Sequence, residues 1–565
     1  MNLPQLNEIA KGVDYKIEFK GLDHNMYVGE GKFYDMENLC ATNYPVMTPR
    51  AARGTVSTLN AAGGIFARGK LAWVNGGKLY YDGQQVYSGL TSGEKTFVGM
   101  GAWIIIFPDG VRYNTSTGES DLLAATYNQT ASATIRLCRQ DGTDYNNVTA
   151  SDAAPTNPAS GKYWLDTSKD VHVLKVYSDG AWVTIPTTYV RLQATGAGRP
   201  FKVGDAVEIS GTGIIDGSHD VIGRTDNSIV IIGVIDQGKT VSSGISIKRE
   251  IPQMDFVVEL NNRLWGCSNA KHEIYCCKLG DPTNWTDYGT NAADAWAATV
   301  GSAGDFTGAV SFGGSVLFFK EDMLHKVYGT KPSNFQITDK PLRGVQKGCH
   351  RSIDVVNESL LYKSRDCVCI YDEGNPMDVS EGLGNRHFTD AAAGSCGDRY
   401  YISMRDEDGA WHLFVFNEAK GMWHREDATH VKQFAELNGQ LYMLTDEGRL
   451  IAVKGREEAG ATLEGDFDWW AETGDMLMEQ GDNKYVSRIQ VRAQIDRGAT
   501  LKIEMMYDSD GHWVQIYSRS GAGRKLSFTV PIIPMRCDHV RMRISGHGRS
   551  AVYAVSKQLE KGSEI

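Results

Sequence analysis

The stretch FAELNGQLYMLTDEGRLIAV, residues 434–453, shows most clearly the pattern that decides the fold. A mostly apolar segment ends at Asn438-Gly439, a second apolar segment follows, and an Asp-Glu-Gly turn leads into a third. Asparagine and glycine tolerate the positive φ angles that tight hairpin loops require, and the apolar segments between them are rich in residues that favour strands. The stretch therefore predicts an antiparallel meander of short strands.

The same pattern occurs at six earlier places, with turn residues at Gly69, Gly101, Asn262, Gly314, Asn357 and Gly397. From Asn262 onward, successive turns lie 52, 43, 40 and 42 residues apart, close to the ~40–45 residues of a four-stranded propeller blade. Unrelated β-meanders are the alternative, and they would not require this near-constant spacing. We expect an all-β fold with a β-propeller of about seven blades. Six or eight blades stay open, because residues 13–58 could supply a closing strand.

One interval breaks the spacing, since 161 residues separate Gly101 from Asn262. This gap predicts a small β domain inserted at residues 125–250, with its two ends close together. After the repeats, strict alternation such as VSRIQVRAQI (486–495) predicts a β-sandwich. The expected parts are an N-terminal arm and closing strand (1–58), a propeller (59–124 plus 251–460), the inserted domain (125–250) and a C-terminal β-sandwich (464–565).

Composition and charge limit the function classes. The net charge is −11, and residues 251–463 carry 21 Lys and Arg against 30 Asp and Glu. A protein that grips duplex DNA would show a basic stripe instead. No apolar run is long enough to span a membrane, and the first residues lack the apolar core of a secretory signal. We therefore expect no membrane segment, and folding in the cytoplasm of the producing cell.

Several motifs that resemble active sites favour ordinary structure. GVIDQGKT (233–240) matches the phosphate-loop pattern, but the sequence after it is strand-like, whereas a phosphate loop needs a helix there, so we expect an ordinary hairpin. SDGAW (178–182) and DEDGAW (406–411) do not complete a sialidase Asp-box and predict Asp-Gly turns. HREDATH (424–430) predicts a solvated loop containing His424 and His430.

The ten cysteines include no C-x-x-C pair, which favours buried reduced thiols over a metal site. We therefore predict no catalytic residue, no metal site and no cofactor, and a protein that is not an enzyme.

Three segments near the two ends carry a family resemblance. They are YVGEGKFYDMENLCATNYPVMTPRAARG (27–54), ETG (472–474) and RCDHVRMRISGHGRSAVYAVSKQLEKGSE (536–564). Together they resemble the packaged-DNA stabilisation proteins of tailed bacteriophages, over about residues 1–124 and 251–565. The resemblance implies a structural protein of the virion tail, a β-propeller hub or nozzle that lines or closes the DNA exit channel and retains the packaged DNA.

The resemblance also implies partners. It implies a homo-oligomeric ring of six copies, assembled in the host cytoplasm, that contacts the portal-adaptor ring and other tail proteins. DNA would pass through it without sequence-specific binding, and an acid-rich wall would repel the phosphates of that DNA.

We assign the assembly contact to the N-terminal arm, because it is too apolar and too restricted by prolines for a free loop. Its candidate residues are Tyr34, Met36, Leu39, Tyr44, Pro45, Val46, Pro49, Arg50 and Arg53. A chain without residues 1–58 should then keep a folded propeller and fail to join particles. The alternatives are a receptor- or glycan-binding tail protein and, less favoured, a polysaccharide hydrolase. A convergence of Trp164, Trp182, Trp285 and Trp296 would favour them.

Overall fold

The structure is a computed structural model that describes residues 12–16, 18–455, 461–476 and 484–561. The described residues form β-strands and four 3-10 turns, so the fold is all-β as the sequence predicts. None of them belongs to a helix long and apolar enough to cross a membrane. The chain forms two compact units. The first is Met1–Lys95, Phe318–His325 and Asp339–Ile565, and the second is Thr96–Leu317 and Lys326–Thr338.

The propeller is built from seven antiparallel sheets among the described residues, each with at least four strands. Three of these sheets lie in the first unit and are each formed by four consecutive strands. The first blade has β6 (Ala62–Arg68), β7 (Lys70–Asn75), β8 (Lys78–Tyr81) and β9 (Gln84–Ser88), and the fifth has β34 (Asp354–Val356), β35 (Ser359–Lys363), β36 (Val368–Tyr371) and β37 (Met377–Asp378). The sixth has β38 (Phe388–Cys396), β39 (Arg399–Asp406), β40 (Trp411–Asn417) and β41 (Met422–Asp427).

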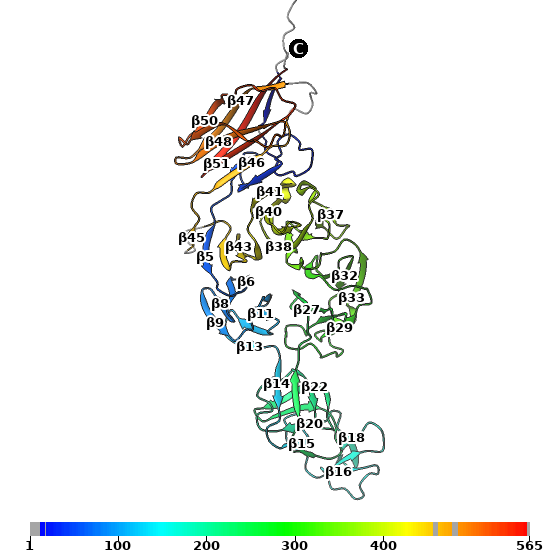
Figure 1. The fold of residues 1–565 in the computed structure, drawn as a ribbon. Coiled ribbons are helices and arrows are strands. Elements are labelled where there is room, and N and C mark those ends of the chain that lie inside the picture. Colours follow the sequence, from blue (N-terminus) through cyan, green and yellow to red (C-terminus); the bar gives the residue numbers. More distant parts are fainter. Residues whose placement is uncertain (1–11, 17, 456–460, 477–483, 562–565) are drawn as a thin grey trace, which may run out of the picture. The chain divides into compact units, whose positions relative to one another are not determined.

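The seventh sheet of the propeller borrows a strand from the N-terminus. Its local strands are β42 (Val431–Leu437), β43 (Gln440–Thr445) and β44 (Arg449–Ala452), and β5 (Gly54–Thr58) pairs with β44. The short β45 (Thr462–Leu463) pairs with the other edge of β5. In Figure 1, β5 lies beside β45, and nearly 400 residues of chain separate it from its other partner, β44.

The second unit holds two further blades. The second blade has strands β10 (Thr96–Met100), β11 (Trp103–Phe107), β12 (Val111–Asn114) and β13 (Ser120–Leu122). The third has strands β26 (Phe256–Leu260), β27 (Arg263–Ser268), β28 (Glu273–Cys276) and β29 (Trp296–Thr299). The remaining sheet has residues in both units: β30 (Gly308–Phe312), β31 (Ser315–Phe319), β32 (Met323–Tyr328) and β33 (Gln336–Pro341).

Tight turns and apolar middle strands account for these blades. All seven hairpin residues predicted from the sequence have positive φ, with values of 68° at Gly69, 55° at Gly101, 62° at Asn262, 71° at Gly314, 44° at Asn357, 63° at Gly397 and 77° at Gly439. All five residues of β31 are buried. Apolar clusters join neighbouring blades; one contains Tyr401 and Leu413 of β39 and β40 together with Leu441 and Met443 of β43. The predicted β-propeller of about seven blades is confirmed.

The inserted domain contains two sheets. The larger has strands β14 (Ala125–Asn128), β25 (Ser246–Arg249), β21 (Ala206–Ser210), β22 (Gly217–Thr225), β23 (Ser228–Ile232), β20 (Tyr189–Gln193), β15 (Ala133–Cys138) and β24 (Lys239–Val241), in that order. The smaller has β16 (Val148–Ser151), β17 (Tyr163–Asp166), β18 (Val173–Ser178) and β19 (Ala181–Thr184). The first strand pairs with the last, Ala125 opposite Arg249, so the ends are adjacent as expected.

The C-terminal sandwich has two sheets, and each takes a strand from the N-terminus. One has the order β1 (Gly12–Lys16), β52 (Ser550–Lys561), β47 (Lys484–Ile495) and β50 (Lys525–Val530). The other has β2 (Asp35–Glu37), β46 (Asp468–Glu472), β51 (Val540–His547), β48 (Thr500–Tyr507) and β49 (Val514–Ser520). Figure 1 shows the blue N-terminal strands among the red C-terminal ones.

Two local predictions were wrong. Residues 233–238 form a loop with no helix after it, but not a hairpin, because β24 pairs with β15 rather than with the preceding β23. His424 lies inside strand β41 and is buried, not in a solvated loop, because the arm covers this strand. The thiols are as predicted: all ten cysteines are free and eight are buried.

The inserted domain has a hydrophobic core of its own, whose buried members all lie between Tyr127 and Ile247. Replacing residues 125–249 with a short Gly/Ser linker should therefore leave the rest folded, with a melting temperature within a few degrees of the full chain's. A matched control deletes only residues 189–232, which removes 11 of the 17 buried residues of that core and should give insoluble or protease-sensitive protein. Loss of soluble expression with the complete deletion would contradict an independent inserted domain.

Candidate functional site

The arm, residues 18–53, lies between the sixth blade (β38–β41) and the C-terminal sandwich, both in the first unit. Backbone hydrogen bonds tie it to the blade and to the turn before it: the Leu22 amide donates to the Trp423 carbonyl of β41 at 2.7 Å, and the His24 amide donates to the carbonyl of Gly382, which precedes β38, at 2.9 Å. On the other side, β2 pairs with β46, with Asp35 opposite Glu472. The arm is therefore a structural part of two domains and not a free extension.

Arg53 anchors the end of the arm in a buried ion-pair cluster. Its Nη2 lies 2.6 Å from Glu426 Oε2 and its Nη1 lies 2.6 Å from Asp427 Oδ2, both at the end of β41. Burial alone would raise the pKa of Asp427, but the Arg53 guanidinium lowers it below the ordinary value. Because Gly54 begins β5, this cluster holds the entry of the closing strand beside the sixth blade.

Arg50 makes the matching connection toward the sandwich. Its guanidinium donates to both carboxylate oxygens of Glu464, at 2.7 and 2.9 Å, and its Nε donates to Asn38 Oδ1 at 2.8 Å. The guanidinium carbon also lies 4.1 Å from the centre of the Phe467 ring. Burial opposes ionisation of Glu464, yet Arg50 lowers its pKa below the ordinary value. An arginine that donates two hydrogen bonds to one carboxylate and stacks on a ring fixes the position of the arm relative to Glu464 more strongly than a lysine would.

The structure buries much of the predicted contact set inside the chain itself. Met36, Leu39, Arg50 and Arg53 are at most 7% exposed. The others are half-buried or exposed, namely Tyr34, Tyr44, Pro45, Val46 and Pro49. The apolar character that suggested a partner subunit is therefore satisfied by the protein's own sixth blade and sandwich. Of the predicted contact residues, Pro45 is exposed and Tyr44 is half-buried, and Met26 and Tyr27 of the same arm are exposed as well.

Truncation of the arm would damage the fold, contrary to the sequence-based expectation. Residues 1–58 include β5, which completes the seventh blade, and β1 and β2, which complete the two sandwich sheets. Removing them would expose three strand edges and the charges left behind on Glu426 and Asp427. Assembly must therefore be tested with point variants.

Sequence reasoning missed a second set of charges at the same junction. Arg425 of β41 approaches Asp35 at 3.4 Å and Glu37 at 3.3 Å. Glu472 of β46 pairs with Arg543 at 2.9 Å and with Arg541 at 3.5 Å. Pairs separated by some 70 to 390 positions leave no local pattern that a single sequence could reveal.

Two buried histidines lie beside the arm. His24 and His424 have almost no exposed side-chain surface, and burial, aided by nearby arginines, lowers the pKa of each to about 3. Nδ1 of His424 has no hydrogen-bond partner among the described residues. His424 lines a cavity of about 30 Å³ between β41 and the arm, which is enough for a single water molecule.

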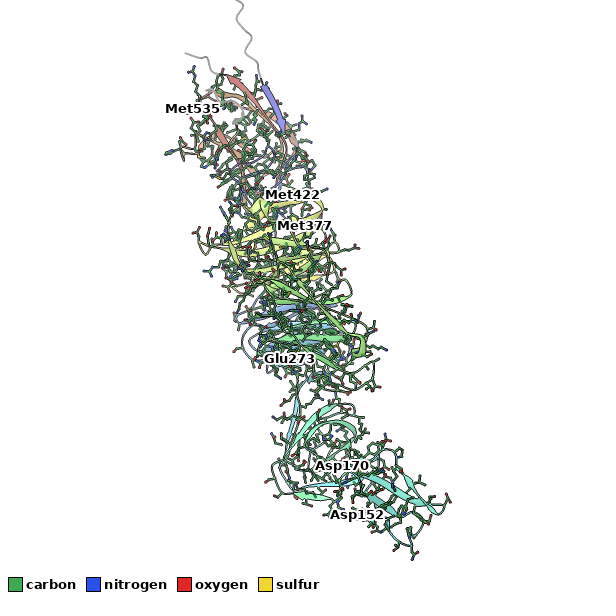
Figure 2. The ribbon with its side chains drawn as sticks, turned by 90° about the vertical axis from the view of Figure 1, so that its right-hand side faces the viewer. Asp152, Asp170, Glu273, Met377, Met422 and Met535 are labelled. Atoms are coloured by element: carbon green, nitrogen blue, oxygen red, sulfur yellow. The ribbon has the colours of Figure 1, made fainter. Side chains whose placement is uncertain are left out.

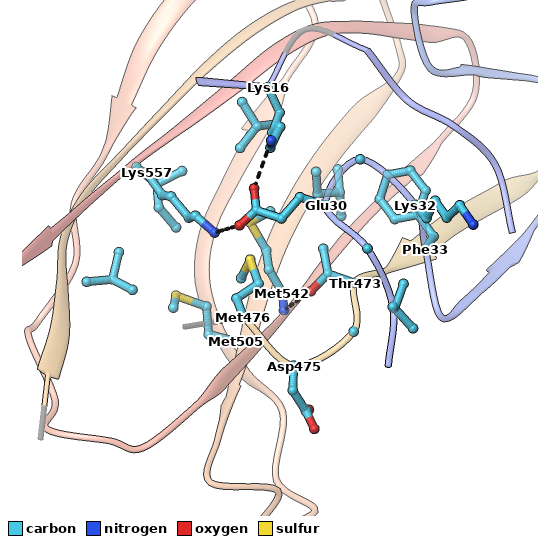
Figure 3. Close-up of a pocket in the computed structure, with 18 of the residues that line it drawn as sticks. Lys16, Glu30, Lys32, Phe33, Thr473, Asp475, Met476, Met505, Met542 and Lys557 are labelled. Atoms are coloured by element: carbon cyan, nitrogen blue, oxygen red, sulfur yellow. Dashed lines mark hydrogen bonds and ion pairs between the residues drawn. The ribbon is translucent and has the colours of Figure 1, made fainter. Parts of the chain in front are cut away.

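A larger cavity, of about 550 Å³, lies between the arm and the sandwich core (Figure 3). Glu30 spans part of its wall, pairing with Lys16 at 3.0 Å and with Lys557 at 2.7 Å. Three methionines form the opposite side, Met476, Met505 and Met542. The size suits a small ligand, but Glu30 and the two lysines are already paired with one another.

The sequence matches no protein-family model. It also matches no curated protein. Solved structures that match part of the chain include Raptor of Chaetomium thermophilum, at 9% identity and a TM-score of 0.30, with 72% of this chain covered. PorZ, a surface component of the type-IX secretion system of Porphyromonas gingivalis, matches at 10% identity and a TM-score of 0.26, with 84% of this chain covered. Hsv2 of Kluyvelomyces marxianus matches at 11% identity and a TM-score of 0.25, with 50% of this chain covered. The alignments cover 29%, 72% and 70% of those chains, so this chain spans less than a third of Raptor. At these values they carry no inference about function.

Arg53→Ala should destabilise the first unit strongly. The change leaves Glu426 buried without its cation, a situation that costs about 3–5 kcal/mol. The matched control is Arg365→Ala, because Arg365 forms an exposed pair with Asp322 at 3.2 Å and should cost less than about 1 kcal/mol. Urea denaturation followed by circular dichroism measures both. Equal midpoints for the two variants would show that the arm cluster contributes no more than a surface pair.

Stability should fall as the pH drops from about 6.5 toward 4. His24 and His424 stay neutral in the folded chain down to a pKa of about 3, whereas in the unfolded chain they take up protons near pH 6.5. Each then costs about 1.4 kcal/mol per pH unit across this window. His424→Gln should flatten the pH dependence of the urea midpoint, and His512→Gln, at an exposed histidine, should leave it unchanged. Identical pH profiles for His424→Gln and the unmodified chain would contradict this assignment.

Proposed function

We propose that the protein is a structural component of a tailed-phage virion, a hub or nozzle ring that lines or closes the DNA exit channel. It would act in six copies, bound to the portal-adaptor ring and other tail proteins, and would retain packaged DNA without binding a specific sequence. The ring would be assembled in the host cytoplasm and would do no catalysis.

The observation that most supports the proposal is where the resembling segments lie. Residues 27–54 and 536–564 are almost 500 positions apart in sequence, yet β2 and β51 belong to the same five-stranded sheet. Met47 forms a bridge with Val552, and the Arg541 guanidinium lies 5.0 Å from the centre of the Tyr34 ring. The two halves of the family resemblance thus meet in a single structural element, as expected if they serve one assembly function.

Charge is a second, weaker support. Residues 251–463, which contribute most of the propeller, carry nine more acidic than basic side chains. An acidic surface repels phosphates within about 8 Å at physiological salt, which suits a wall that DNA passes without adhering.

The direct test is electron microscopy of the purified protein and of particles that contain it. We expect a ring with an axial channel, and particles lacking the protein should leak DNA. The paired variant Tyr44→Asp with Pro45→Asp should melt somewhat lower than the unmodified protein, because it loses the Tyr44 hydrogen bond to Glu18, but it should stay folded and fail to join particles. The matched control is Val183→Asp at an exposed site of the inserted domain, outside the family resemblance.

The outcomes separate the two parts of the proposal. A protein that stays monomeric at all concentrations, together with particles that retain DNA without it, would overturn the conduit function. Normal assembly of the Tyr44/Pro45 variant would overturn only the assignment of the arm as the contact.

A further inference from the structure

The small sheet of the inserted domain carries a cluster of aromatic side chains on one face. Side chains alternate along a strand and share a face with their cross-strand partners. Trp164 of β17 is opposite Lys175 of β18, and Tyr177 of β18 is opposite Trp182 of β19. These four side chains therefore lie on one face, together with Asp166. Asp152 and Asp170, labelled in Figure 2, lie in the loops that flank the sheet.

The three rings come from three adjacent strands and meet above β18. The Trp182 ring centre lies 5.3 Å from that of Trp164 and 5.3 Å from that of Tyr177, in edge-on arrangements of 63° and 62°. Asp179 and Gly180, both at positive φ, form the turn that sets this register. Trp164 is buried beneath the cluster, whereas Trp182 and Tyr177 are only half-buried and keep part of their rings accessible.

Polar groups border the rings at fixed positions. The Lys175 ammonium lies 4.7 Å above the Trp164 ring and 2.8 Å from Asp166 Oδ2. Asp166 Oδ1 accepts hydrogen bonds from the amide and hydroxyl of Ser168, so the carboxylate is held in one orientation. A donor and an acceptor thus stand next to an aromatic surface with little freedom to move.

The cluster is not needed for the main core of the inserted domain. That core contains no residue of the small sheet. The opposite face of the sheet has buried residues of its own: Leu165 and Leu174 are fully buried, and Tyr163 packs against Tyr145 at 4.9 Å. The other candidate tryptophans do not join the cluster, since Trp285 is buried elsewhere and Trp296 packs on Trp265 at 5.9 Å.

We propose that this aromatic face binds a neutral carbohydrate. A sugar ring offers an apolar C–H face, which packs on Trp182 and Tyr177, and a rim of hydroxyls that exchange hydrogen bonds with Lys175 and Asp166. Polyanions fit the site poorly, because the inserted domain carries 12 basic and 13 acidic residues and has no basic excess. The inference does not rest on the conduit function, and either can fail without the other.

The test uses the full chain on an array of neutral hexose and N-acetylhexosamine oligosaccharides, followed by affinity electrophoresis in gels containing the polysaccharide bound best. Trp182→Ala and Tyr177→Ala should each weaken retention by tenfold or more, and Trp182→Phe should restore most of it. Val183→Ala is the matched control, because Val183 is exposed on the same strand and points to the opposite face. Thermal melts of each variant show whether the fold is kept.

Three outcomes would overturn the proposal. They are the absence of retention by any sugar on the array, unchanged retention of a folded Trp182→Ala variant, and loss of retention with Val183→Ala as well. Binding that appears only with dextran sulfate or DNA and is abolished by salt would also overturn it, by identifying a site for polyanions. If Trp182→Ala fails to fold, Tyr177→Phe and Tyr177→Ala in the same gels decide the result.

Discussion

The pairing of β5 with β44 is the interaction on which most of the first unit depends. The seventh blade supplies only three strands from residues 431–452, and an unpaired edge strand would leave a row of backbone donors and acceptors without partners. The chain meets this need with residues 54–58. Once β5 is held there, the residues just before it have to lie against the sixth blade, which places Arg53 beside Glu426 and Asp427. The position of the arm is thus a consequence of completing a sheet.

The charges buried along the arm set its position more than they raise its stability. Removing ions from water is costly, and a buried pair often contributes little more than an apolar pair of similar size. A buried ion pair does, however, disfavour every other position of the arm, because any shift of the arm leaves a charge buried without its partner. Arg50 and Arg53 sit three positions apart and reach toward the sandwich and the blade respectively. A shift of the arm in either direction would break both sets of bonds, so the pair defines a single register.

Local signals in the sequence predicted the propeller well, because a blade is a local object. The turn residues Gly69 and Asn262, for example, have the positive φ that the hairpin pattern requires. The same reasoning could not find β2, which is three residues long and is a strand only because β46 lies beside it. Nor could it place His424, whose burial depends on an arm some 400 residues away. The apolar arm residues Met36 and Leu39 suggested a contact with another subunit, whereas the structure buries both against other parts of the same chain.

The two proposed roles place different demands on the architecture. The proposed ring would have to keep its subunit surfaces unchanged, whereas a surface proposed to recognise glycans would gain from freedom to vary. The inserted domain is attached through one antiparallel pair, β14 with β25, and Arg249 secures this base through Asp205 at 2.6 Å and the carbonyls of Leu122 and Leu123. Its core is built from its own residues, so changes on the small sheet need not disturb the blade that carries it. An aromatic face on β16–β19 can therefore acquire or lose a ligand without altering the arm and sandwich, where the family resemblance is concentrated.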